Sequence, residues 1–258
     1  MAIIDISNLR LLDDLLFAVC CQENIPCTEI IIQTALNNFN IKIESVKIQY
    51  HIKSLQEHSV YLDVLAIDTK TNQYFNIEVQ RSDEGADVKR ARFHCSIIDS
   101  NLLKTSTPYS KLPTLYVIFI TENDIWGAGK ALYPMERFNI VTGEPFEDRQ
   151  HILYVNASYE GDDPLGMLMH DFLCSDPDDM LTPLLAEKAR YLKTDPKGVD
   201  IMCRTMEELR EESLKRGEEA ALLRSIKNIM EGLKYTSQQA MDLLKIPVSD
   251  QPKYLSKL

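Results

Sequence analysis

The sequence predicts an α/β protein in which a mixed central β-sheet is flanked by helices. Two short runs of alternating or mostly apolar residues lie on either side of a polar turn, which is typical of a strand hairpin. A nearly continuous apolar run at residues 112–120 follows a stretch with helical spacing. The resulting order is helix, strand, strand, strand, helix, strand, strand, helix, and this order is typical of an α/β core.

The first part of the chain is expected to be helical. Apolar residues recur every three or four positions over residues 9–37, and Asn24 and Pro26 divide this stretch into two helices. Residues 43–50 alternate apolar and polar side chains and predict the first strand.

Residues 60–67 and 74–80 are expected to form the second and third strands. The segment between them, TKTNQ, is polar and short, so the two strands should pair as an antiparallel hairpin.

The remaining elements alternate between helix and strand. Residues 87–103 have helical spacing, residues 112–120 read as a strand buried on both faces, and residues 150–156 as another strand. A helical stretch is expected from residue 167 to residue 193. Pro196 and Gly198 mark a boundary, which predicts a domain over residues 1–195 and a charged helical region over residues 196–258. Thr236 or Ser237 is expected to cap a small helical hairpin at the end.

Composition limits the possible functions. The chain has 258 residues, 45% hydrophobic and 26% charged, with a net charge of −11, which argues against a broad nucleic-acid coat. Residues 81–111 nevertheless carry six basic and four acidic residues, a local excess of positive charge that is compatible with one local DNA-binding groove. The six cysteines and five histidines lack zinc-type spacing. No apolar run reaches membrane-spanning length and the start lacks leader features, so we expect a cytoplasmic protein with no membrane partner.

The candidate site lies in the predicted hairpin. Asp63 should stand roughly opposite Glu78, and Gln80 should share a face with Glu78 because side chains alternate along a strand. Two adjacent carboxylates repel each other unless a cation or a proton intervenes. Magnesium, which favours one or two carboxylates plus water and phosphate oxygens, is the natural cation. The alternative is a solvated cross-strand pair.

The ordered set YLDVLAID, YFNIEVQ, KRARFHCSIIDSNLL, PYSKLPTLYVIFI and DIWGAGKALY resembles the recombination-promoting nuclease and transposase family of the PD-(D/E)XK nuclease superfamily. The resemblance covers roughly residues 9–175. It implies a restriction-endonuclease-like core and a magnesium-dependent DNA endonuclease, with manganese as a substitute, acting in DNA recombination, mobile-element biology or defence against foreign DNA. The residue before Leu62, the apolar neighbour of Asp63, is Tyr61 and not proline, so only the aspartate of the superfamily name is present here.

The resemblance also implies roles for individual residues. Asp63 and Glu78 would bind the metal with help from the Val79 carbonyl, and Gln80 would orient the attacking water where the superfamily usually has lysine. Glu29, or alternatively Glu23, would add a carboxylate from the first helices. Arg90 and Arg92 would contact DNA phosphates, because the guanidinium group of arginine can bind two phosphate oxygens at once.

Two other functions fit the same sequence. One is a catalytically weak or inactive DNA- or protein-binding module that keeps the nuclease fold. The other is an interaction protein whose charged C-terminal helices do the work. The charged helix also suggests a homodimer, because cutting both DNA strands requires two active sites. Trp126, followed by two glycines, either contacts DNA bases or packs under a loop.

Overall fold

A computed structural model describes residues 5–22, 24–52, 60–255 and 257–258. The described residues form two compact units, one that ends at residue 202 and one that begins at residue 203. In the described residues of the first unit, six strands form one mixed sheet in the order β1-β2-β3-β4-β6-β5. The predicted fold class, a mixed sheet flanked by helices, is confirmed.

The sheet combines an antiparallel meander with a parallel centre. Strands β1 (Ser45–Ile52), β2 (Val60–Asp68) and β3 (Gln73–Gln80) are antiparallel neighbours, whereas β3, β4 (Thr114–Thr121) and β6 (Gln150–Asn156) run parallel. The expected hairpin is therefore confirmed. Its turn follows from sequence, because the Asp68 carboxylate accepts hydrogen bonds from the amides of Lys70 and Thr71, while Asn72 adopts a positive φ of 54°.

Strand β5 (Leu132–Met135) was not predicted from the sequence. It has four residues and contains Pro134, which has no amide to donate to a ladder. Such a residue is tolerated at an edge, and β5 is one of the two edge strands of the described sheet, paired only with β6.

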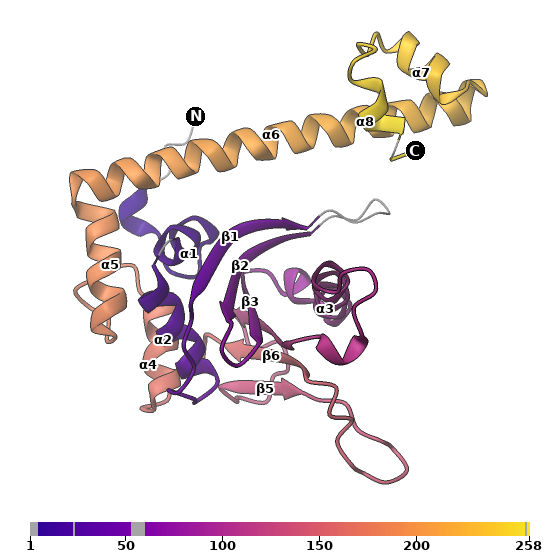
Figure 1. Ribbon diagram of the computed structural model, residues 1–258. Helices are drawn as coiled ribbons and strands as arrows, with labels where there is room; N and C mark the ends of the chain where they lie inside the picture. The colour runs from indigo at the N-terminus through magenta and orange to yellow at the C-terminus, as the bar shows by residue number, and fades with distance from the viewer. Residues whose placement is uncertain (1–4, 23, 53–59, 256) are drawn as a thin grey trace. The chain divides into compact units, whose positions relative to one another are not determined.

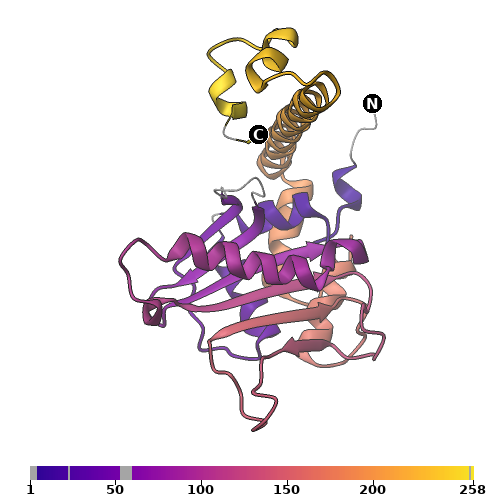
Figure 2. The ribbon, with the colours of Figure 1, turned by 90° about the vertical axis from the view of Figure 1, so that its right-hand side faces the viewer.

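Helices cover both faces of the sheet (Figure 1). One face carries α1 (Asp14–Cys21), α2 (Ile25–Ala35), α4 (Pro164–Leu173) and α5 (Pro183–Thr194), whose apolar side chains form the larger core with Phe75, Ile118 and Val155. The other face is covered by α3 (Val88–Leu102), which lies across the strands in Figure 2. The cysteines of this unit that lie in the interior are free thiols.

The expected continuous helix from 167 to 193 is wrong: residues 174–182 interrupt it. The Asp171 carboxylate, fully buried, accepts hydrogen bonds from the amides of Leu181 and Thr182, and this fixes the break before Pro183 starts α5. No single helix of the described chain has the length and apolar character to cross a bilayer, and the apolar pair α1 and α2 is bent by 111°.

The second unit is helical. It contains most of α6 (Pro196–Leu233), followed by α7 (Ser237–Leu243) and α8 (Gln251–Leu255), around a small core with Ile226 and Met241. Thr236 is the N-cap of α7 and forms a capping box with Gln239. The expected helical hairpin and its cap are confirmed.

The hydroxyl of Tyr154 is a destabilising polar group in the core between α3 and the sheet. Tyr154 is 1% exposed, burial raises its pKa to about 12, and its hydroxyl has no hydrogen-bond partner among the residues described. An unsatisfied buried polar group costs about 1–3 kcal/mol. We therefore expect Tyr154→Phe to leave the free energy of unfolding unchanged or raise it by up to about 1 kcal/mol, measured by urea unfolding.

Tyr133→Phe is the matched control for this prediction. The Tyr133 hydroxyl donates to Asp124 at 2.8 Å and accepts from the Lys130 amide at 3.0 Å, so its removal should destabilise the protein by about 1 kcal/mol. A clear loss of stability in Tyr154→Phe would show that its hydroxyl is satisfied.

Candidate active site

The site forms where β2 and β3 separate. Their pairing runs from Asp68–Gln73 to Val64–Ile77, whereas β2 continues to pair with β1 up to Val60. Figure 1 shows β1 and β2 continuing past the end of β3. We call the gap beyond the Val64–Ile77 pair the β2–β3 fork.

Asp63 and Glu78 stand on the two sides of this fork. The Asp63 amide donates to Glu78 Oε1 at 3.2 Å, and the Val79 amide donates to Asp63 Oδ2 at 3.1 Å. The two side chains thus take the place of the next backbone hydrogen bonds of the ladder. The expected pairing of the two carboxylates is present, and backbone amides hold both of them.

Burial makes these carboxylates reluctant to ionise. Burial is the main reason that the pKa of Asp63 rises to about 7, and the nearby negative charge of Asp14 is the next. Burial also raises the pKa of Glu78 well above its usual value, and the charge of Asp63 adds to this. Glu78 is fully buried. In the absence of a bound cation, burial therefore favours the protonated form of both carboxyl groups.

A buried polar chain supports Glu78 from behind. Asn76 Nδ2 donates to Glu78 Oε1 at 2.8 Å and to the Val64 carbonyl at 3.2 Å, so Asn76 Oδ1 is left as an acceptor. His94 Nδ1, 3.2 Å from that oxygen, is therefore the protonated nitrogen. Burial, with the Arg90 charge, lowers the pKa of His94 to about 4. His94 is neutral, and its 3.6 Å approach to Glu78 is no ion pair at neutral pH.

Arg90 supplies the positive charge nearest to Glu78. Its Nη2 donates to Glu78 Oε2 at 3.2 Å, its Nη1 to the Gly85 carbonyl at 2.8 Å and its Nε to His94 Nε2 at 3.4 Å. The guanidinium also lies 5.9 Å from the centre of the Phe119 ring. The structure thus places this predicted phosphate ligand in the site, already paired with a carboxylate.

Gln80 and the Val79 carbonyl complete the edge of the fork. The Gln80 carbonyl accepts from the Glu122 amide at 2.9 Å on the β4 side. Because successive residues of a strand direct their backbone groups to opposite edges, the Val79 carbonyl faces the fork. The Gln80 side chain occupies the space over Gly85: a Cβ added there would lie 1.9 Å from Gln80 Oε1.

The acid that approaches the fork from the first helix is Asp14, and not the expected Glu29. Asp14 begins α1, and its charge contributes to the raised pKa of Asp63. Glu29 instead receives hydrogen bonds from Lys42 at 2.9 Å and from the Ile43 amide at 2.9 Å, which tie α2 to the segment before β1. The alternative, Glu23, lies outside the described residues.

An ion-pair network fixes the start of α1 beside the sheet. Arg81, directly after β3, bonds Asp13 at 2.8 Å and Glu122 at 3.3 Å, and Arg10 bonds Glu122 at 2.9 Å. These contacts join the residue that precedes Asp14 to the ends of β3 and β4. The network therefore sets where Asp14 stands.

Arg92 lies apart from this group. It is exposed on α3 and stands two residues from Arg90, a rotation of about 200° around the helix axis. The structure brings together Asp63, Glu78, Val79, Gln80 and Arg90, but it does not bring Arg92 or Glu29 to them.

Other site residues had no recognisable signal in the sequence. Gln49 lies on β1 opposite Asp63 and forms a hydrogen bond with the Asp63 carboxyl group. Its φ of 45° is strained for a residue other than glycine. Asn76 and His94 were visible only as polar residues within apolar patterns. Asp14 sits in an ordinary LLDDLLF stretch, and only the docking of α1 places it near the fork.

The donor set of the fork suits a hard cation. Two carboxylates and one carbonyl oxygen converge there, and oxygen ligands of this kind are those that Mg²⁺ prefers. Burial, and then the neighbouring negative charges, raise the pKa of both carboxyl groups, and a bound cation would offset both effects. No group of three or more His, Cys, Asp or Glu side chains with metal-binding geometry occurs among the described residues, so water or phosphate would have to fill the remaining positions.

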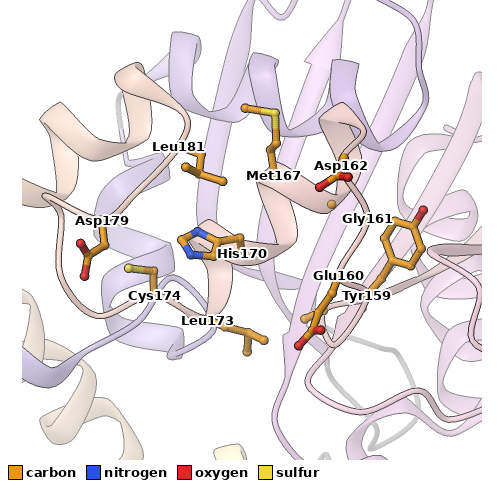
Figure 3. A pocket seen from close by; sticks show the side chains of 12 residues that line it. Tyr159, Glu160, Gly161, Asp162, Met167, His170, Leu173, Cys174, Asp179 and Leu181 are labelled. Carbon is orange, nitrogen blue, oxygen red and sulfur yellow. The ribbon is translucent and has the colours of Figure 1, made fainter.

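A separate pocket of about 820 Å³ lies beside α4 (Figure 3). Its lining includes Tyr159, Met167, His170 and Cys174. Residues 157–181 contain seven acids and no lysine or arginine, so this region repels phosphate. The pocket is therefore a poor candidate for nucleic-acid chemistry.

The middle part of the chain matches a known protein family. Residues 28–159 match the family described as PD-(D/E)XK nuclease family transposase. The matched segment holds the whole fork and α3, while α1 with Asp14 precedes it. No curated protein and no solved structure matches the chain.

Proposed function

Because the chain belongs to the PD-(D/E)XK nuclease family transposases, we propose that it is a magnesium-dependent DNA endonuclease with its catalytic centre at the β2–β3 fork. The observation that carries the proposal is the pair Asp63 and Glu78, whose carboxylates face each other across the buried end of the β2–β3 ladder and are held there by backbone amides. Its physiological setting would be DNA recombination, mobile-element biology or defence.

Each residue of the fork has a role in this proposal. Asp63, Glu78 and the Val79 carbonyl would hold the magnesium ion, which when bound lowers the pKa of a water molecule and stabilises charge on the phosphate. Gln80 orients the attacking water through its amide, which has a donor and an acceptor but no charge. Arg90, whose side chain is 37% exposed, balances the carboxylate charge and offers its free face to a phosphate. Arg92 would contact phosphate more remotely.

Cleavage of supercoiled plasmid tests this function. We expect purified protein to nick or linearise the plasmid with magnesium or manganese and to leave it intact with EDTA. A parallel RNA substrate tests the preference for DNA. A folded protein that binds DNA but does not cut it with either metal would instead support the binding-module function. A specific observation favours that alternative. The Glu78 carboxylate already accepts hydrogen bonds from Arg90, Asn76 and the Asp63 amide, and a metal ion would have to compete with these donors.

A substitution at Gly85 tests the role of Gln80. The backbone there has an ordinary negative φ, so Gly85→Ala should fold, but its methyl group would overlap Gln80 Oε1 and displace that side chain. We expect cleavage to slow by about 10- to 100-fold, since small misplacements near the reacting groups cost that much.

The matched control is Gly217→Ala on α6, where nothing lies within 4 Å of the added methyl group. It should retain full cleavage and stabilise its helix by about 1 kcal/mol. Unchanged cleavage in Gly85→Ala would contradict the role assigned to Gln80.

A homodimer is the oligomeric state proposed with this function. Cutting both strands requires two catalytic centres, and a two-fold dimer supplies them. Sedimentation of the full chain with and without DNA tests it, and a monomer in both conditions would contradict it.

A further inference from the structure

Trp126 stands in a loop built to hold it. The loop follows β4 and lies at the same end of the sheet as Gln80, whose register partner is Thr121. The Asp124 carboxylate accepts hydrogen bonds from the amides of Trp126, Gly127 and Gly129 at 3.1, 3.0 and 2.7 Å. Gly127 and Gly129 have φ values of 64° and 67°, which favour glycine. The loop therefore fixes the tryptophan backbone.

The indole of Trp126 packs against two tyrosine rings and is partly exposed to solvent. It packs nearly perpendicular to Tyr154, with ring centres 5.8 Å apart, and lies 6.3 Å from Tyr133. The residue is still 43% exposed. A large aromatic surface that is both fixed and exposed is suited to stacking against a flat ligand. The expectation that Trp126 packs under a loop is thus met only in part.

A row of aromatic rings connects Trp126 to the fork. Glu78 pairs in register with Phe119 on β4, and Phe119 with Tyr154 on β6. The rings of Phe119 and Tyr154 stack at 5.5 Å. Two strand spacings place Tyr154 about 10 Å from Glu78. Trp126 packs on Tyr154, so it lies within the length of a few nucleotides from a phosphodiester held at Glu78.

The charges near the fork give a second reason for a stacking contact. Arg10 and Arg81 are bound by Asp13 and Glu122, and Arg90 is bound by Glu78. Arginines paired in this way attract phosphate weakly, in a chain of net charge −11. Stacking on a base does not depend on charge and contributes substantially to the binding of single strands.

We propose that Trp126 stacks on an unpaired nucleobase, and that the substrate of this nuclease is DNA with an unpaired nucleotide close to the phosphodiester to be cut. The inference rests on the proposed nuclease function. In an intact duplex each base already stacks on its neighbours, so a side chain reaches a base face only at a single strand, a gap, a flap or an end.

Trp126 is the sole tryptophan of the chain, so its fluorescence reports on this residue alone. The full chain carrying Asp63→Asn, which should bind without cutting, is titrated in magnesium with a labelled single strand, a blunt duplex and a gapped duplex. Label anisotropy gives the affinity, and tryptophan emission gives the stacking. We expect quenching with the single strand and the gapped duplex, but not with the blunt duplex.

Variants separate stacking from general binding. Trp126→Ala should weaken single-strand binding by about 5- to 100-fold, and Trp126→Phe should retain most of it, because stacking on an aromatic ring accounts for that range. Tyr109→Ala, which removes an 82% exposed aromatic residue preceding β4, should change nothing. DNA binding without quenching, or with equal loss in Trp126→Ala for all three DNAs, would overturn the stacking proposal alone. Failure to bind any DNA would overturn the nuclease proposal with it.

Discussion

Replacing Asp63 by asparagine is expected to make the metal-free protein more stable. At pH 8 the Asp63 carboxylate is ionised beside Glu78, although burial and neighbouring charge raise its pKa from 3.8 to about 7. Each unit of upward shift corresponds to about 1.4 kcal/mol, so we expect a gain of roughly 2–4 kcal/mol in the free energy of unfolding. The asparagine oxygen can still accept from the Val79 amide. Urea unfolding in EDTA measures the gain.

Asp68→Asn provides a matched control on the same strand. The Asp68 side chain is also buried, but hydrogen bonds from Thr71 and Lys70 outweigh the effect of burial and lower its pKa. Its charge is therefore stabilising, and its removal should cost about 1 kcal/mol. Equal losses of stability in the two variants would contradict the strain assigned to the fork.

The metal-free wild type is expected to lose stability as pH rises from 6.5 to 8. Asp63 and Glu78 have folded pKa values above their unfolded values, so the native state binds more protons in this range. Their contribution is fully present below the unfolded pKa and is lost as pH rises through the folded pKa. His94, with a pKa lowered to about 4, has the opposite effect, but only below about pH 6.5.

The expected loss is about 1–2 kcal/mol across this window, since one proton contributes at most about 1.4 kcal/mol per pH unit. Magnesium should restore most of it at pH 8, because a ligand that binds only the native state stabilises it. Thermal unfolding with EDTA or magnesium, at both pH values, measures the effect, and Asp63→Asn should flatten the pH dependence. A wild type that becomes more stable toward pH 8 in EDTA would contradict this assignment.

The hairpin and its two acids were predictable from sequence because the signals are local. The side-chain period of two and the polar turn determine that Asp63 and Glu78 lie opposite each other. The sequence did not indicate that the β2–β3 ladder ends at Val64–Ile77. Beyond that pair, β2 remains paired with β1 but no longer with β3, and this depends on all three strands. The fork is a property of three strands together.

The surroundings of Glu78 could not be predicted because they come from distant elements. Arg90 and His94 lie on α3 and Asn76 on β3, and they meet only after α3 packs on the sheet. Glu29 looked suitable because it lies on an early helix. The structure uses it for a hydrogen bond to Ile43, while the docking of α1 brings Asp14 toward the fork.

The measurement that tests the central claim most directly is plasmid cleavage by four proteins side by side in magnesium. These are the wild type, Asp63→Asn, Glu78→Gln and the control Asp68→Asn, each shown to be folded by circular dichroism. The claim that the fork is the catalytic centre requires cutting by the wild type and Asp68→Asn, and a loss of at least about 100-fold in the two fork variants. Cutting at wild-type rates by folded Asp63→Asn or Glu78→Gln would show that the centre lies elsewhere.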